Sequence, residues 1–124
     1  MILSIALGGA LGSVLRHYSI AAWVKAAGDA FPYGTLFVNV LGSFIIGLLM
    51  EMMALKWQAS LETRAFLVTG VLGGFTTFSA FSLDVFKLVE TDHPLSAVIY
   101  VTTSLGASLC AVFGGAYLIR HVVA

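Results

Sequence analysis

The sequence predicts an all-α membrane protein with four transmembrane helices. Of its 124 residues, 60% are hydrophobic and 10% are charged, whereas a soluble domain carries about 25% charged residues. A helix needs about 20 consecutive apolar residues to cross the hydrocarbon core of a bilayer. Four stretches meet that requirement, at residues 2–24, 33–55, 65–89 and 94–119, and the connectors between them are short. We therefore expect one integral membrane domain over residues 1–124.

The first stretch, residues 2–24, is interrupted only by Arg16 and His17 and contains the small-residue run GGALG at 8–12. Small residues let membrane helices approach closely, so this run predicts a helix–helix contact face. It lacks the strand and acidic partner of a dinucleotide-binding turn. Arg16 has two interpretations. It is a structural cation that extends toward the interface, or a charge that attracts anions into a vestibule.

The second stretch, residues 33–55, carries polar side chains at a spacing of four, at Thr35, Asn39 and Ser43. Residues four apart share one face of a helix. An amide within the hydrocarbon needs a partner, so Asn39 either bonds another helix or takes part in function. Glu51, the one charge of this stretch, lies near its end.

The third stretch, residues 65–89, contains GGFTTFSAFS at 73–82. Glycine and threonine are weak helix formers, so we expect the helix to break near its middle, between residues 73 and 77. A break at membrane depth exposes main-chain carbonyls, which are the usual ligands of hard cations in broken-helix transporters. Phe78 and Phe81 are three residues apart and project from nearby positions. They either pack against lipid and core or line a pathway.

The fourth stretch, residues 94–119, starts with Pro94, which suits the first turn of a helix, and carries no charge. Tyr100, Ser104 and Ser108 follow one another at intervals of four. Such a strip of hydroxyls either binds neighbouring helices or solvates a dehydrated ion, because a hydroxyl both donates and accepts hydrogen bonds.

The basic residues divide almost evenly between the two sides of the predicted bundle. The side that holds both termini has Lys56, Arg64 and Arg120, and the other side has Lys25 and Lys87, with Arg16 deep in the first stretch. A membrane protein is normally oriented by an excess of Lys and Arg on one side. The balance reflects either chance in a small count or insertion in both orientations, with antiparallel pairing of two copies.

Composition also excludes several classes of function. The formal net charge is zero, whereas nucleic-acid binding calls for a basic patch, so we expect no nucleic-acid partner. A single cysteine, Cys110, excludes an intrachain disulfide framework. No set of His, Asp, Glu or Cys has metal-ligand spacing, and no buried acid–base–nucleophile set is indicated. We therefore expect a protein that is not an enzyme.

With these motifs the sequence resembles the Fluc (CrcB) family of bacterial fluoride channels over essentially its whole length. The resemblance rests on four spans, on a glycine-rich first span that ends in Arg16, on GTL at 34–36 with VN at 38–39, and on the run at 73–82. It implies a passive fluoride-selective channel that exports cytoplasmic fluoride through the bacterial inner membrane. It also implies a dual-topology homodimer with two antiparallel subunits, surrounded by lipid, and two pores.

The resemblance further implies roles for individual residues. Side chains that match the family's pore are Asn39, Phe78, Phe81, Tyr100, Ser104 and Ser108. Arg16 matches an arginine near the aqueous vestibule. A structural sodium ion is expected at the dimer centre, held by the main-chain carbonyls of Gly73 and Thr76. Asp84 falls where some members have glutamate, and no role is assigned to it.

Simple electrostatics is compatible with an anion pathway. The edge of a phenylalanine ring is positive and can face an anion, and an asparagine amide offers two N–H donors. These groups would bind an anion weakly, as conduction requires. One alternative is a proton-coupled small multidrug-type transporter, which needs a carboxylate in the first span, where residues 2–24 have none. Another is a membrane assembly subunit, which leaves the polar strips unexplained.

Overall fold

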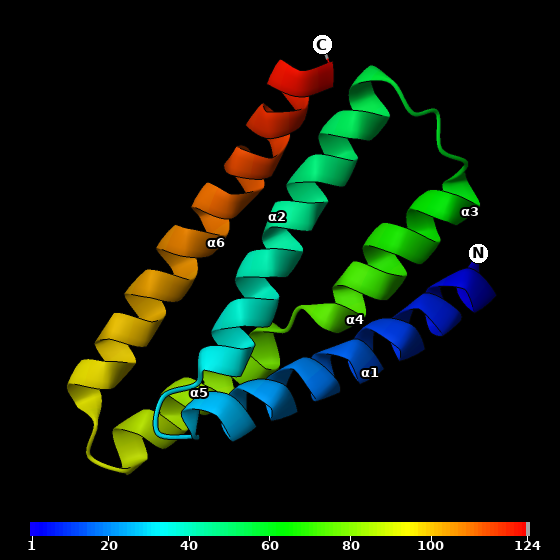
Figure 1. The fold of residues 1–124 in the computed structure, drawn as a ribbon. Helices are drawn as coiled ribbons and strands as arrows, with labels where there is room; N and C mark the ends of the chain where they lie inside the picture. The colour runs from blue at the N-terminus through cyan, green and yellow to red at the C-terminus, as the bar shows by residue number, and fades with distance from the viewer. Residues whose placement is uncertain (124) are drawn as a thin grey trace.

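The computed structural model describes residues 1–123, and the chain in this range is helical, without a strand (Figure 1). The helices in chain order are α1 (Ile2–Ala27), α2 (Tyr33–Leu55), α3 (Leu61–Arg64), the π-helix η1 (Ala65–Leu72), α4 (Gly73–Phe75), α5 (Phe78–Glu90) and α6 (Pro94–Val123). The all-α class predicted from composition is thus confirmed, and α6 begins at Pro94 as expected.

Three helical stretches in the described range are long and apolar enough to cross a membrane, namely Tyr33–Leu55, Leu61–Glu90 and Pro94–Val123. The chain is therefore a multi-pass membrane protein. Helix α1 has 26 residues, which exceeds the roughly 20 that a span needs, but Arg16 and His17 reduce its hydropathy. That α1 crosses the bilayer as a fourth span stays a prediction.

The helices associate in two pairs (Figure 1). Helix α6 runs along α2, and α1 runs along η1 and α4. Glycines lie at both contacts: a Cβ at Gly8 or Gly12 of α1 would overlap main-chain atoms of η1, and a Cβ at Gly47 would overlap the main chain of α6. The contact face predicted from residues 8–12 is confirmed. Such close backbone approach is how membrane helices maximise van der Waals contact without a hydrophobic driving force.

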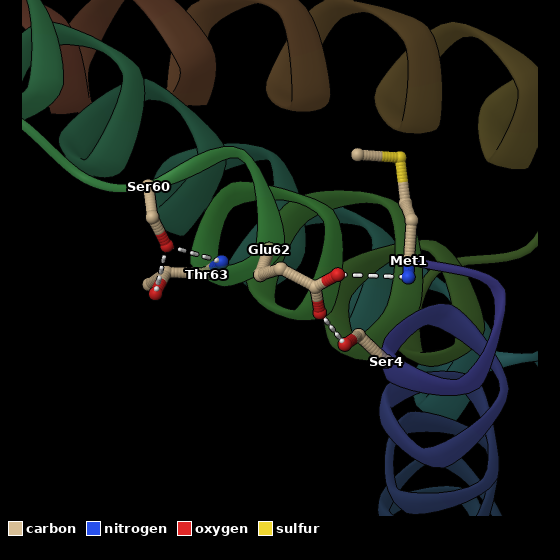
Figure 2. A network of polar contacts seen from close by, with 5 residues as sticks. All are labelled: Met1, Ser4, Ser60, Glu62 and Thr63. Carbon is tan, nitrogen blue, oxygen red and sulfur yellow. Dashed lines mark hydrogen bonds and ion pairs between the residues drawn. The ribbon is translucent and has the colours of Figure 1, made fainter.

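Polar contacts hold the start of α1 against α3 (Figure 2). The Met1 ammonium lies 2.8 Å from Glu62, and the Ser4 hydroxyl donates to the same carboxylate. Ser60 caps α3, because its hydroxyl accepts a hydrogen bond from the Thr63 N–H at 3.1 Å. At the other helix pair, Arg120 of α6 donates to both carboxylate oxygens of Glu51 on α2. These contacts lie at the bundle end opposite the α5–α6 turn.

The helix is interrupted at residues 76 and 77, between α4 and α5. The apolar core nearest to this interruption is formed by α5 and α6. It comprises the buried residues Phe81, Leu88, Ala97 and Tyr100. Helix α5 thereby packs on α6, although the α4 segment just before it packs on α1. The chain passes from one helix pair to the other at residues 76 and 77, and the candidate site lies there.

Candidate functional site

The chain leaves helical geometry at Thr76 and Thr77, between α4 and α5. Thr76 has φ −86° and ψ 158°, and Thr77 has φ −157° and ψ 123°, both extended. Thr76 is tied back to the preceding helix, because its N–H and its hydroxyl donate to the Leu72 carbonyl at 3.0 and 2.9 Å. Residues Ala65–Leu72, which precede α4, form a π-helix. π-Helical turns are rare, and those that occur are often found at functional sites.

Asn39 holds the interrupted backbone. Its Oδ1 accepts a hydrogen bond from the Thr77 N–H at 2.7 Å, and its Nδ2 donates to the Thr77 carbonyl at 3.0 Å. The side-chain amide therefore pairs with Thr77 as a neighbouring strand would. One of the two Asn39 N–H donors is used within the chain, so only the other is available to a ligand. Sequence reasoning treated both donors as available.

Two backbone amides are diverted from helical partners at this point. In a continuous helix the Thr77 N–H would bond the Gly73 carbonyl, but it bonds Asn39. The Ala80 N–H would bond the Thr76 carbonyl, but it donates to the Thr77 hydroxyl at 3.1 Å, which caps α5. The carbonyls of Gly73 and Thr76 thus lose their usual donors.

An open groove of about 310 Å³ lies beside the interruption. It is lined by Asn39, Ser43, Ile46, Thr76, Thr77, Phe78, Phe81, Ser104, Leu105, Ser108 and Leu109. Five of the six predicted pore side chains meet there, from α2, α5 and α6. No charged residue is among the groove residues, so its polar side chains are one amide and several hydroxyls.

The phenylalanine rings of the groove differ in exposure. Phe78 is 74% exposed, whereas Phe81 is 8% exposed. Their ring centroids are 5.5 Å apart at an interplanar angle of 46°. Phe81 is held from behind by Tyr100, whose ring centroid lies 5.1 Å away. One ring of the pair is thus fixed by packing, and the other is mostly uncovered by its own chain.

Ser104 contributes a buried hydroxyl to the groove lining. It is 5% exposed, and its Oγ is the one buried side-chain polar atom in residues 1–123 that lacks a hydrogen-bond partner. Burying a hydroxyl without a partner is costly. Such an atom marks a place where an ion or a water molecule gains a hydrogen bond.

The sixth predicted pore residue, Tyr100, does not line the groove. It is fully buried one turn before Ser104, and its hydroxyl donates to Asp84 Oδ2 at 3.0 Å. The pair links α6 to α5. Arg16 is half-buried on α1 and also lies outside the groove, because α1 packs on η1 and α4.

Sequence reasoning missed three participants in this site. It assigned no role to the Thr77 main chain or to Asp84, and it read Ser43 only as part of a polar face. The helical spacing of Ser43 from Asn39 could have placed it in the groove. No sequence signal indicates the other two, because their partners are 38 and 16 residues away along the chain.

Metal-binding side chains do not gather in the part of the chain that the structure describes, where no group of three or more His, Cys, Asp or Glu residues lies together. The Gly73 and Thr76 carbonyls, whose helical donors are diverted, are groups of the type that binds hard cations. That a sodium ion binds there stays a prediction.

Comparison with known proteins places the chain in a family. Residues 3–116 match the family model described as "CrcB-like protein, Camphor Resistance (CrcB)". A relative from Rhizobium meliloti (strain 1021), named fluoride-specific ion channel FluC, is 55% identical over 98% of both chains. A relative of the same name from Agrobacterium fabrum is 52% identical over 95% of this chain and 94% of its own. This chain therefore belongs to the CrcB family.

Proposed function

We propose that the protein is a fluoride-selective ion channel, and not an enzyme, that lets cytoplasmic fluoride leave the cell passively. The relatives named above as fluoride-specific ion channels support this function. The observation that carries it in this chain is the uncharged groove at the interrupted helix. An amide, hydroxyls and phenylalanine rings, whose edges are positive, can bind an anion without a full positive charge, so the ion would be held weakly enough to move on.

The conducting unit in this proposal is an antiparallel homodimer with two pores. Two features support it. The groove is open on one side, and Phe78 is 74% exposed there, so a second copy would supply the missing wall. The basic residues divide almost evenly between the two ends, as dual topology requires. Helix α1 then crosses the bilayer as the fourth span, and the inner membrane of a bacterium is the location.

A sodium ion at the dimer centre forms part of the same proposal. The carbonyls of Gly73 and Thr76 support it, because their helical donors are diverted to Asn39 and to the Thr77 hydroxyl. Main-chain carbonyls of broken helices bind sodium in other transport proteins. The ion would fix the position of the two interrupted helices relative to each other.

Fluoride efflux from liposomes tests the function. Liposomes loaded with potassium fluoride and reconstituted with the full chain should release fluoride when a potassium ionophore is added, and should release little chloride under the same conditions. Flux that required an imposed proton gradient would contradict a passive channel. Phe81→Ile should abolish release, and Phe86→Ile, an exposed residue of the same helix outside the groove, is the matched control. Unchanged flux in Phe81→Ile would remove that ring from the pore.

Labelling tests the dual topology. In a Cys110→Ser background, a cysteine introduced at Val123 should react with an impermeant maleimide added to either side of the membrane. Each side should label a substantial fraction of the protein, and both sides together should label nearly all of it. Labelling from one side alone would contradict insertion in both orientations.

A further inference from the structure

Gly42 of α2 lies directly against the interruption. A Cβ at this position would come closer than 3.0 Å to the Cγ2 methyl of Thr76, a separation that real Cβ atoms essentially never show. The next atom of another helix, Phe75 Cδ2, would be 3.5 Å away, which is ordinary contact. The space left by the absence of a side chain at Gly42 is therefore filled by one group, the Thr76 methyl.

The Thr76 side chain has little freedom to avoid an added atom. Its hydroxyl donates to the Leu72 carbonyl at 2.9 Å, and a β-branched side chain is stiff at χ1. Rotating the methyl away from α2 would break that hydrogen bond. Keeping the hydrogen bond would require the Thr76 backbone to withdraw from α2 by roughly 1 Å before normal contact is regained.

Withdrawal of Thr76 would act on the next residue. Thr77 is paired with Asn39 through hydrogen bonds of 2.7 and 3.0 Å, and Asn39 lies one turn before Gly42 on the same face of α2. A hydrogen bond weakens steeply with distance and misalignment. The separation between α2 and the interruption at position 42 therefore sets the geometry of the Asn39 amide in the groove.

We infer that Gly42 is a positioning residue for the ion pathway: its contact with the Thr76 methyl sets the distance at which Asn39 engages the interrupted helix. The inference rests on the proposed function only in its flux readout. The pairing of Asn39 with Thr77 is measurable without any ion, through exchange of the Thr77 backbone N–H.

The test compares four forms of the full chain: the unmodified protein, Gly42→Ala, Thr76→Ser, and the double variant Gly42→Ala/Thr76→Ser. Thr76→Ser removes the methyl and keeps the hydroxyl. Gly42→Ala should lower fluoride flux and raise the exchange rate of the Thr77 amide, each by about tenfold or more, because two hydrogen bonds are weakened. The double variant should return both quantities to within about threefold of the unmodified protein.

Gly114→Ala is the matched control, since a Cβ at Gly114 of α6 meets no atom of this chain within 4 Å. It should leave flux and Thr77 exchange unchanged. Normal flux and exchange in Gly42→Ala would overturn the inference. If Gly42→Ala does not assemble, the double variant decides: recovered assembly and slow Thr77 exchange support the inference, and failure to recover overturns it. An unmodified protein without fluoride flux would refute the proposed function, while the Thr77 exchange measurements would still test Gly42.

Discussion

Replacing Asn39 by alanine should destabilise the protein through the interrupted backbone. The change removes both hydrogen bonds to Thr77, of 2.7 and 3.0 Å. Thr77 is only 8% exposed, so water does not readily replace the lost partners. A hydrogen bond contributes about 0.5–1.5 kcal/mol net, and more when a buried group is left unpaired. Interhelical hydrogen bonds in membranes average about 0.6 kcal/mol. Together these magnitudes predict a loss of about 2 kcal/mol in the free energy of unfolding.

Equilibrium unfolding in mixed micelles, followed by tryptophan fluorescence at a fixed protein concentration, measures this loss. The concentration must be constant because the stability of the proposed dimer would depend on it. Ser43→Ala is the matched control: it lies four residues further along α2 and lines the same groove. It should change the free energy of unfolding by less than about 0.5 kcal/mol.

Asn39→Asp sharpens the same prediction. Aspartate has nearly the same shape and still accepts the Thr77 N–H, but it has no donor for the Thr77 carbonyl and places a negative charge beside it. We expect a loss at least as large as that of Asn39→Ala, together with loss of anion flux. The reasoning would be refuted if Asn39→Ala and Ser43→Ala unfolded with equal free energies.

Three further predictions follow from individual contacts. Ser104→Ala removes a buried hydroxyl without a partner in residues 1–123. The free energy of unfolding should stay the same or rise, and fluoride flux should fall. A clear loss of stability would show that the Ser104 hydroxyl has a partner. Tyr100→Phe leaves Asp84 without its donor and should lower the free energy of unfolding by about 1 kcal/mol. The double variant with Asp84→Ala should lose less than the sum of the two single losses. Strict additivity would show that the pair is not coupled. Gly12→Ala drives a methyl into a main-chain carbonyl of η1 and should cost about 1–3 kcal/mol in unfolding measurements; an unchanged stability would show that α1 and η1 separate freely.

Features set by hydropathy and by local sterics could be predicted from the sequence. The helical class follows from the apolar stretches, and the start of α6 follows from Pro94, whose missing N–H is not needed in a first turn. The glycine face of α1 follows from residues 8–12, because close approach of two backbones requires small side chains at that spacing.

The position of the interruption shows where local reasoning ends. The break was expected somewhere between residues 73 and 77, and the extended residues, 76 and 77, lie in that range, but residues 73–75 stay helical. A Cβ at Gly74 would lie 2.6 Å from the Gly9 carbonyl of α1, so these glycines serve helix packing. Helix propensity is a weak prior that tertiary contact overrides. The π-helix before the break gives no signal in composition or periodicity.

The polar groups of the site are of two kinds, those that bond within the fold and those that have no partner there, and the sequence could not separate them. Asn39, Thr76 and Thr77 direct their hydrogen bonds at one another or at the preceding helix, and Tyr100 directs its hydroxyl at Asp84. These partners depend on how the helices pack, so a spacing of four residues does not reveal them.

This division has a consequence for how an ion would move. Donors already engaged in the fold are not available to a passing ion. Few donors are then left free: the second N–H of Asn39 and the buried Ser104 hydroxyl are two of them. A pathway with few free donors and an aromatic edge binds an anion weakly at each point, which favours conduction over trapping. In the proposed channel, the groups that hold the interruption would therefore limit how tightly the groove binds an ion. Substitutions at Asn39 should then change both stability and flux, whereas substitutions at Ser104 should change flux alone.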